Sequence, residues 1–165
     1  MIALKIEDLK TFTAQLFMGE TFDHWLVREV NIVTFNSFTI DGRIRQGYYS
    51  DEELETNRIE ELSSWKTLRP FCYSLIRGRK LPESFQITLQ LSPEENEKFI
   101  RRVKPDLSAD QVAALYLNIR YENHAAACVT GTSLKIFMLD KQIEQEWDET
   151  VRRYFKKLQI PYVEV

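Results

Sequence analysis

The chain has 165 residues, of which 44% are hydrophobic and 28% are charged, and its formal net charge is −3. This length suits one domain with a core that needs no cross-links, and the composition is ordinary for a soluble globular protein. No apolar run approaches the roughly 18 residues of a membrane helix, and the first ten residues lack an apolar signal core. We therefore expect a cytoplasmic protein, and the acidic balance argues against a dedicated nucleic-acid-binding domain.

The two cysteines, Cys72 and Cys128, are too few for a disulfide framework or a cysteine metal cage. Each lies among apolar neighbours in the sequence. We expect both to be buried, reduced thiols.

The first half of the chain predicts a strand at 2–6, a helix over 8–18, a β-hairpin and a second helix. The strongest hairpin signal is Asp41-Gly42, between the runs 25–40 and 43–49, because a type I′ turn needs positive φ at both central residues. Pro70 is tolerated only in a first helical turn, so the second helix is expected to begin near Leu68 and to end at Gly78.

The sharpest charge contrast lies between the hairpin and that helix. Residues 51–61 contain six acidic residues and one base, Arg58, and are the one plausible internal linker. Residues 62–82 contain five bases and no acid.

The second half repeats the order of the first. Residues 85–91 alternate like a strand, Ser92-Pro93 opens a capped helix that Pro105 bounds, and a strand follows at 115–121. A hairpin of strands 125–130 and 134–139 is predicted around Gly131-Thr132-Ser133, followed by a helix over 141–158 and a strand at 160–165. The expected fold class is α+β: one domain over residues 1–165, with pseudo-repeats at 1–84 and 85–165 that form a curved antiparallel sheet with helices on one face.

Two β-α-β-hairpin-α repeats of this size resemble the TATA-binding-protein-like fold. A sliding-clamp-like domain is the rival, but it would have one helix per half. The runs "FNSFTIDGRI", "WKTLRPFCYSLIRGRKLP" and "EQEWDETVRRYF" resemble a family of bacterial proteins of unknown function. That resemblance implies a small cytoplasmic protein and supplies no activity.

The sequence contains no nucleophile elbow, P-loop, HExxH, CxxC or dinucleotide fingerprint. A catalytic or metal site would depend on His24 and His124, with Asp23 and Glu122 beside them. Ordinary histidines at loop ends are the more common explanation, so we expect no cofactor and no metal.

Basic residues give the candidate binding sites. Five basic residues of the sheet are expected to point away from the core: Arg28, Arg43, Arg45, Arg120 and Lys135. In the resembled fold this face binds DNA, where Phe38 could insert as a wedge between neighbouring base pairs. Arg77, Arg79 and Lys80, in the basic segment 66–80, could contact phosphates or an acidic partner. The more common explanation is that such residues are solvated or are neutralised by the acidic linker. The corresponding region of the second half is Ala127, Cys128 and Val129, which contains no aromatic residue. The absence of a second wedge argues against DNA bending.

The favoured function is a non-enzymatic binding or adaptor module that uses an open sheet face or edge. The partner would be a protein or a second copy of the chain, because the aromatic set Phe35, Phe38, Tyr48 and Tyr49 is expected to be exposed. Nucleic-acid binding and an unrecognised enzyme are the alternatives. A continuous positive sheet face would favour nucleic acid, and a mixed face would favour a protein partner.

Overall fold

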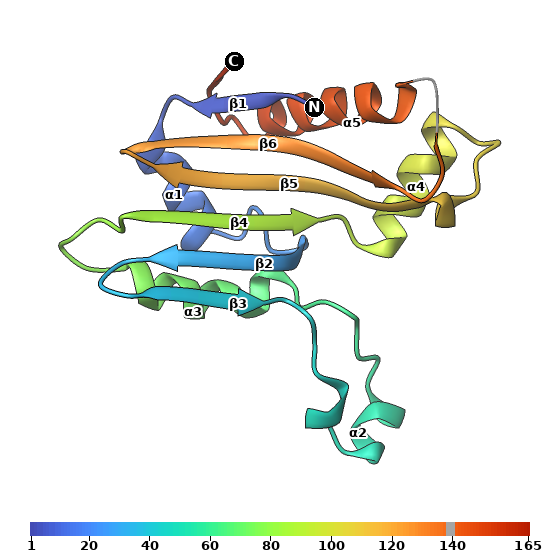
Figure 1. The fold of residues 1–165 in the computed structure, drawn as a ribbon, viewed down its shortest axis with the longest axis horizontal. Coiled ribbons are helices and arrows are strands. Elements are labelled where there is room, and N and C mark those ends of the chain that lie inside the picture. Colours follow the sequence, from blue (N-terminus) through green and yellow to red (C-terminus); the bar gives the residue numbers. More distant parts are fainter. Residues whose placement is uncertain (138–140) are drawn as a thin grey trace.

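The computed structural model describes residues 1–137 and 141–165, and it contains a seven-stranded sheet with helices on one face (Figure 1). The strands are β1 (Ala3–Ile6), β2 (Leu26–Val33), β3 (Ser37–Asp41), β4 (Ser84–Gln90), β5 (Val112–Glu122), β6 (Ala125–Leu134) and β7 (Tyr162–Glu164). The helices are α1 (Leu9–Phe17), α2 (Asp51–Thr56), α3 (Trp65–Ile76), α4 (Pro93–Val103) and α5 (Gln142–Lys157), with 3₁₀ turns at Gln46–Tyr48 and Ala109–Gln111. The predicted α+β class is confirmed.

The strands lie in the order β3-β2-β4-β5-β6-β1-β7, and every pair is antiparallel. The order of elements along the chain repeats as expected, but the pairing does not. β4 lies between the two hairpins, whereas its counterpart β1 lies outside β6 and does not pair with β2. The likeness to the TATA-binding-protein-like fold therefore stays a prediction about element order.

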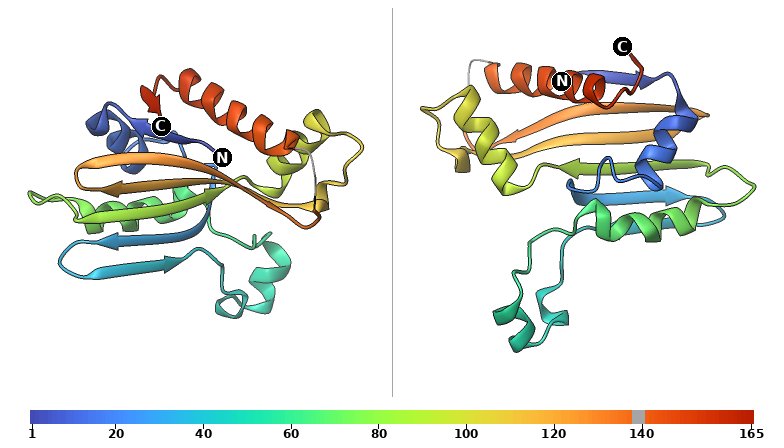
Figure 2. Two further views of the ribbon diagram at one scale, coloured as in Figure 1. Left: turned by 45° about the horizontal axis from the view of Figure 1, so that its top comes forward. Right: turned by 180° about the vertical axis from the view of Figure 1, so that it is seen from behind.

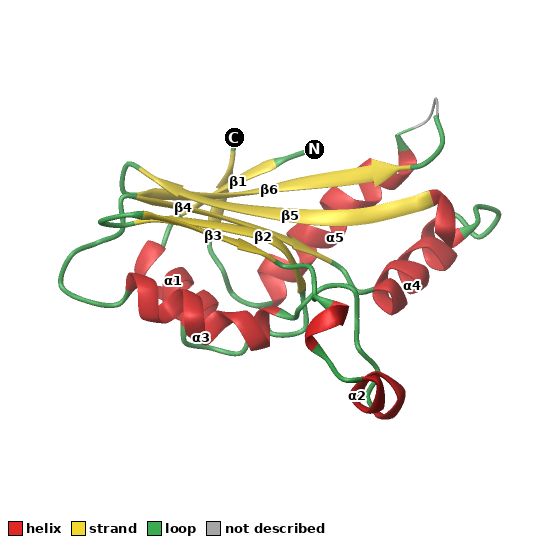
Figure 3. Ribbon diagram, turned by 60° about the horizontal axis from the view of Figure 1, so that its bottom comes forward, coloured by secondary structure: helices red, strands yellow, loops and turns green. Residues whose placement is uncertain are grey.

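Period-two alternation gives the sheet one apolar face. Phe85, Ile87 and Leu89 of β4 are buried, while the residues between them are partly exposed. Helices α1, α3, α4 and α5 cover the apolar face, with α1 packed on α3 and α4 on α5 (Figure 2). No helix in the described part of the chain covers the opposite face, which we call the bare face (Figure 3).

The first hairpin turns earlier than the sequence predicts. Its turn is at residues 34–36, where Thr34 N donates to Asn36 O (2.9 Å), and β3 ends at Asp41. Gly42 is buried and needs to be glycine for another reason: a Cβ there would lie 1.8 Å from the Val27 carbonyl oxygen. The Asp-Gly pair marks a close backbone approach beside a β-bulge in β2, between Val27 and Glu29, and not a type I′ turn.

The second hairpin also differs from the prediction. Its two-residue turn is Asn123-His124, with φ of 52° and 59°, which is the positive-φ pair that a type I′ turn requires. Residues 125–134 then form one continuous strand through Gly131. The last part of the expected strand at 134–139, residues 138–139, lies outside the described residues.

Helix α3 begins at Trp65, three residues before the expected start. The Ser64 side chain caps it by accepting from Thr67 N, and Pro70 is tolerated inside the helix. Trp65 is fully buried and its indole Nε1 donates to Leu16 O (2.8 Å). Burial of this ring stabilises the first turn of α3, and Pro70 removes one backbone hydrogen bond from the same helix.

Candidate functional site

The edge strand β3 leaves a row of backbone groups without a partner. Thr34 N donates to Asn36 O and Gly42 N donates to Arg28 O, so even-numbered residues of β3 direct their backbone groups toward β2. Ser37, Thr39 and Asp41 therefore present their N–H and C=O groups outward, where the described residues place no further strand. This edge can accept an extended chain.

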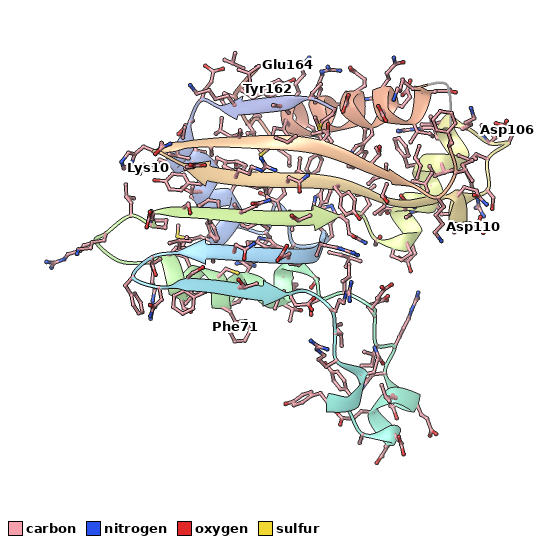
Figure 4. All side chains as sticks on the ribbon, in the orientation of Figure 1. Lys10, Phe71, Asp106, Asp110, Tyr162 and Glu164 are labelled. Atoms are coloured by element: carbon pink, nitrogen blue, oxygen red, sulfur yellow. The ribbon has the colours of Figure 1, made fainter. Side chains whose placement is uncertain are left out.

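Three phenylalanines lie along the same edge. Phe35, in the turn before β3, is 85% exposed and its ring contacts Phe38 edge-on, with centroids 5.7 Å apart. Phe71, on α3, is 64% exposed and projects past β3 (Figure 4). We call these rings, with the outward backbone of Ser37, Thr39 and Asp41, the edge surface.

Phe38 is on the helix-covered side of the sheet. It lies opposite the buried Ile32 in the β2–β3 register, which puts its ring away from the bare face. The prediction that Phe38 projects from the bare face as a wedge is wrong, because the hairpin turn comes several residues earlier than expected and a shifted turn changes which residues face the core.

The acidic segment is an ordered arm that extends past β3 (Figure 1). Its neck joins residues 42–44 to 61–63, through Ile44 N to Glu61 O (2.9 Å) and Ser63 N to Gly42 O (2.8 Å). Its tip holds α2, which begins with a capping box between Ser50 and Glu53. No residue of α2 is buried, and Tyr48 beside it is 85% exposed. Residues 51–61, expected to be a linker, thus form a projecting element without a core of its own.

Most of the predicted basic residues lie off the bare face. Arg43 and Arg45 belong to the neck and base of the arm, not to a return strand, because β3 has already ended. Arg28 is exposed at the β-bulge, and Lys135 follows the end of β6. Arg28 and Arg120 lie within strands, and the register places Arg120 on the bare face, opposite Gln86.

The bare face has mixed charge. The strand register places the cations Lys5 and Arg120 and the anions Glu29, Asp41 and Glu122 on this face. Neutral polar residues fill its centre, where Thr39 donates to Asn31 (2.7 Å) and Thr88 donates to Asn118 (3.1 Å). The strand residues of this face therefore do not form a continuous positive surface for the phosphate backbone of a nucleic acid.

Arg77, Arg79 and Lys80 form an exposed basic loop between α3 and β4. This loop lies beside the end of β2, since Glu83 N donates to Val33 O (2.8 Å), while the arm joins β2 near Val27. Six residues of strand, roughly 20 Å, separate these positions, so the arm of one molecule does not neutralise its own basic loop. Of the two ordinary interpretations of these residues, neutralisation within one molecule does not fit this separation, whereas a solvated loop agrees with their exposure.

Arg69, the remaining arginine of that segment, has a structural role. Its Nε and Nη2 donate to Asp23 Oδ1 (2.8 Å) and Oδ2 (2.9 Å), and both side chains are mostly buried. The paired carboxylate raises the pKa of Arg69 above its usual value. This bidentate pair fixes α3 against the segment before β2.

The two histidines are at opposite ends of the sheet. His124 is in the β5–β6 turn, near Ser84, whereas His24 precedes β2 at the end near Gln90. No group of three or more possible metal ligands occurs within residues 1–137 and 141–165. The sequence-based idea of a joint site with Asp23 and Glu122 is therefore wrong.

Both cysteines are free and buried, as expected. Burial raises the pKa of the Cys72 thiol to about 12 and also raises the pKa of Cys128. Neither forms a thiolate near neutral pH.

The profile of a family of unknown function, DUF5721, matches residues 15–163. The chain belongs to this family. The matched region of the DUF5721 protein includes the edge surface, the arm and the basic loop. The match over residues 15–163 confirms the prediction that the chain belongs to a family of unknown function. No curated protein and no solved structure matches the chain. None of the described helices is long and apolar enough to cross a membrane.

Proposed function

We propose that this DUF5721 protein is a non-enzymatic binding module whose edge surface pairs with a β-strand of a protein partner. The observation that carries this proposal is the open edge of β3, flanked by exposed phenylalanines. Edge strands of natural proteins are usually protected by lysine, proline or short length, and the sequence of β3, SFTID, contains neither residue type.

A second copy of the chain is the partner that the geometry favours. A twofold axis through Thr39 would pair that residue with Thr39 of the second copy, and Ser37 with Asp41. These are the residues with outward backbone groups, so each would find a partner. On the helix side, Phe38 would meet Ile40, and no like charges would oppose each other.

The same axis gives the arm a role. It would place the acidic arm of each molecule beside the basic loop of the other, because the two features lie at opposite ends of one edge (Figure 1). The arm carries Asp51, Glu52 and Glu55 on its exposed helix, and the loop carries Arg77, Arg79 and Lys80. Their charges are complementary between molecules.

A proline substitution tests the proposal. Thr39→Pro removes one outward N–H and leaves the bonds to β2 in place, so we expect it to shift the protein from dimer to monomer in analytical ultracentrifugation. Thr39→Ala keeps the N–H and is the matched control, which we expect to remain dimeric. A wild-type protein that is monomeric at high micromolar concentration would contradict the choice of a second copy.

A library of extended peptides separates the two parts of the proposal. Peptide binding that Thr39→Pro abolishes in a monomeric protein would support strand pairing with another protein. If the wild-type protein is monomeric and binds none of the peptides, the proposal that β3 pairs with a strand of a partner is also contradicted.

A further inference from the structure

A pocket of about 350 Å³ lies on the helix side of the molecule, away from the edge surface. It is between α4, α5 and the segment that leads into β2. Four aromatic rings form much of its wall: Trp25, Phe99, Trp147 and Tyr154. This volume is within the range of small-ligand sites, which are typically lined by aromatic side chains and a few polar groups.

The aromatic rings are held in fixed positions. Trp25 is 6.1 Å from Trp147 and 5.8 Å from Tyr154, centroid to centroid, and Phe99 meets Trp147 edge-on at 5.7 Å. Their polar atoms already have partners within the protein. Trp25 Nε1 donates to the Tyr154 hydroxyl (3.2 Å), which donates to Thr21 O (3.0 Å), and Trp147 Nε1 donates to Tyr116 O (2.9 Å).

Those polar atoms are occupied, and Trp25, Phe99 and Trp147 are only 3%, 5% and 1% exposed, so Tyr154 is the most accessible of the four rings. Burial also raises the pKa of Tyr154, so its hydroxyl stays protonated at neutral pH. Charge for recognition must therefore come from the rim.

The rim carries an excess of positive charge. Arg102 lies over the Phe99 ring, with Cζ 5.6 Å from its centroid, and its Nη2 donates to Thr150 Oγ1 (3.2 Å). No carboxylate pairs with Arg102 in the parts of the chain that the structure describes. Lys98 is paired with Glu95 (3.2 Å), which leaves Arg102 as the fixed cation of the rim, with the exposed His24 also at the pocket.

We propose that this pocket binds a small planar aromatic anion, whose ring lies against Tyr154 and the exposed margins of Trp25 and Trp147 and whose carboxylate pairs with Arg102. A guanidinium over the face of an aromatic ring is attracted to that ring and keeps its remaining N–H donors available to a carboxylate. A ligand of this class would use both properties of the site, the apolar walls and the unpaired arginine.

The test compares two probes with the same ring and opposite charge, 2-naphthoate and 2-naphthylmethylamine. The readout is the set of indole N–H signals in ¹H–¹⁵N spectra. Trp25 and Trp147 line the pocket, while Trp65, bonded to Leu16 O, is fully buried outside it and serves as an internal control. We expect 2-naphthoate to shift the first two signals saturably, to leave Trp65 unchanged, and to bind ~10-fold more tightly than the amine.

Two arginine variants complete the test. Arg102→Gln should weaken 2-naphthoate binding ~10-fold and leave amine binding unchanged. Arg101→Gln is the matched control, because Arg101 pairs with Glu97 and does not line the pocket, so binding should match the wild type. Equal affinity for the two probes, no saturable shift, a shift of all three indole signals, or an Arg102→Gln variant that binds like the wild type would each overturn the proposal.

Discussion

The two edges of the sheet differ in how they are protected. β7 has three residues, follows Pro161, and its Glu164 is held by Arg152 of α5 through contacts of 2.7 and 3.1 Å. β3 has five residues, no proline or lysine, and exposed phenylalanines beside it. Short length, proline and a fixed charge are the usual means of preventing edge-to-edge association. The comparison shows that β7 carries these protective features and that β3 lacks the proline and the fixed charge.

The largest expected effect is at the residue that holds β3 in place. Gly42→Ala would put a Cβ 1.8 Å from the Val27 carbonyl oxygen, so β3 and the neck of the arm would have to move. We expect the free energy of unfolding to fall by about 3 kcal/mol in urea denaturation. Gly47→Ala is the control within the same arm, because a Cβ there meets nothing within 4 Å. Equal stability of the two variants would contradict the close approach.

The next largest loss of stability is expected at Asp148 of α5, which lies near the β1–β7 edge of the sheet. Asp148, 7% exposed, accepts from the buried Thr130 hydroxyl and from the Met1 amino group (3.0 Å). Asp148→Ala would leave Thr130 without its acceptor, and we expect a loss of about 2 kcal/mol in thermal or urea unfolding.

The same variant sharpens the comparison of the edges, since its dimerisation should be unchanged wherever it is folded. Gln145→Ala, at an exposed position of the same helix, should change neither quantity. A dimer lost with Asp148→Ala under folding conditions would show that association does not depend on the β3 edge alone.

Charge reversal at the arm and the loop should have a smaller effect on association. Glu52→Lys with Glu55→Lys would repel the basic loop of the second copy, and we expect dimerisation to weaken roughly 3- to 10-fold at low salt. Arg79→Glu with Lys80→Glu should weaken it similarly, and the combined four changes should restore it.

Reversal of Lys156 and Lys157, at the exposed end of α5, controls for net charge. If this control weakens the dimer as much, or if the combined variant is not rescued, the arm does not contact the basic loop. Ultracentrifugation over a salt series measures each case.

The smallest effect is at the protected edge. Arg152 hydrogen-bonds Glu164 and lowers the pKa of that carboxyl. A lowered folded-state pKa means that the contact stabilises β7 above the unfolded pKa of Glu164 and is lost as pH falls through the folded value. We expect faster amide exchange in β7 at acidic pH.

Arg152→Gln should reproduce that faster exchange at neutral pH and leave dimerisation unchanged. Arg153→Gln, on the exposed neighbouring position, should exchange like the wild type. Unchanged exchange in Arg152→Gln would show that the ion pair does not hold β7 in place.

Local signals predicted most of the strands and every helix except α2, which lies in the expected linker. The capped start at Ser92-Pro93, the apolar stripe of α5 and the alternation of β4 each depend on residues close together in sequence. Family membership also followed from runs of sequence alone. The turns were less predictable: Asp41-Gly42 fits a type I′ turn, but the tertiary structure uses that glycine for a close approach to Val27.

The candidate site was only partly predictable. Exposure of Phe35 was expected, although the sequence placed it within a strand and the structure places it in a turn. The position of Phe38 depended on that turn, and Phe71 gave no signal because it lies within an otherwise amphipathic helix. The pocket could not be found from sequence, since its four aromatic residues come from separate segments, with Trp25 and Tyr154 129 residues apart, and look like ordinary core residues.

The sequence by itself determined the α+β class, the repeated order of elements and the strong contrast between acidic and basic segments, because periodicity, capping and charge are properties of neighbouring residues. Only the tertiary structure decided that β4 lies between the hairpins, that β3 is left at an edge, and that the acidic arm and basic loop lie at opposite ends of that edge. Strand pairing is fixed by hydrogen bonds and packing between distant segments, and no local pattern records which strand remains unpaired.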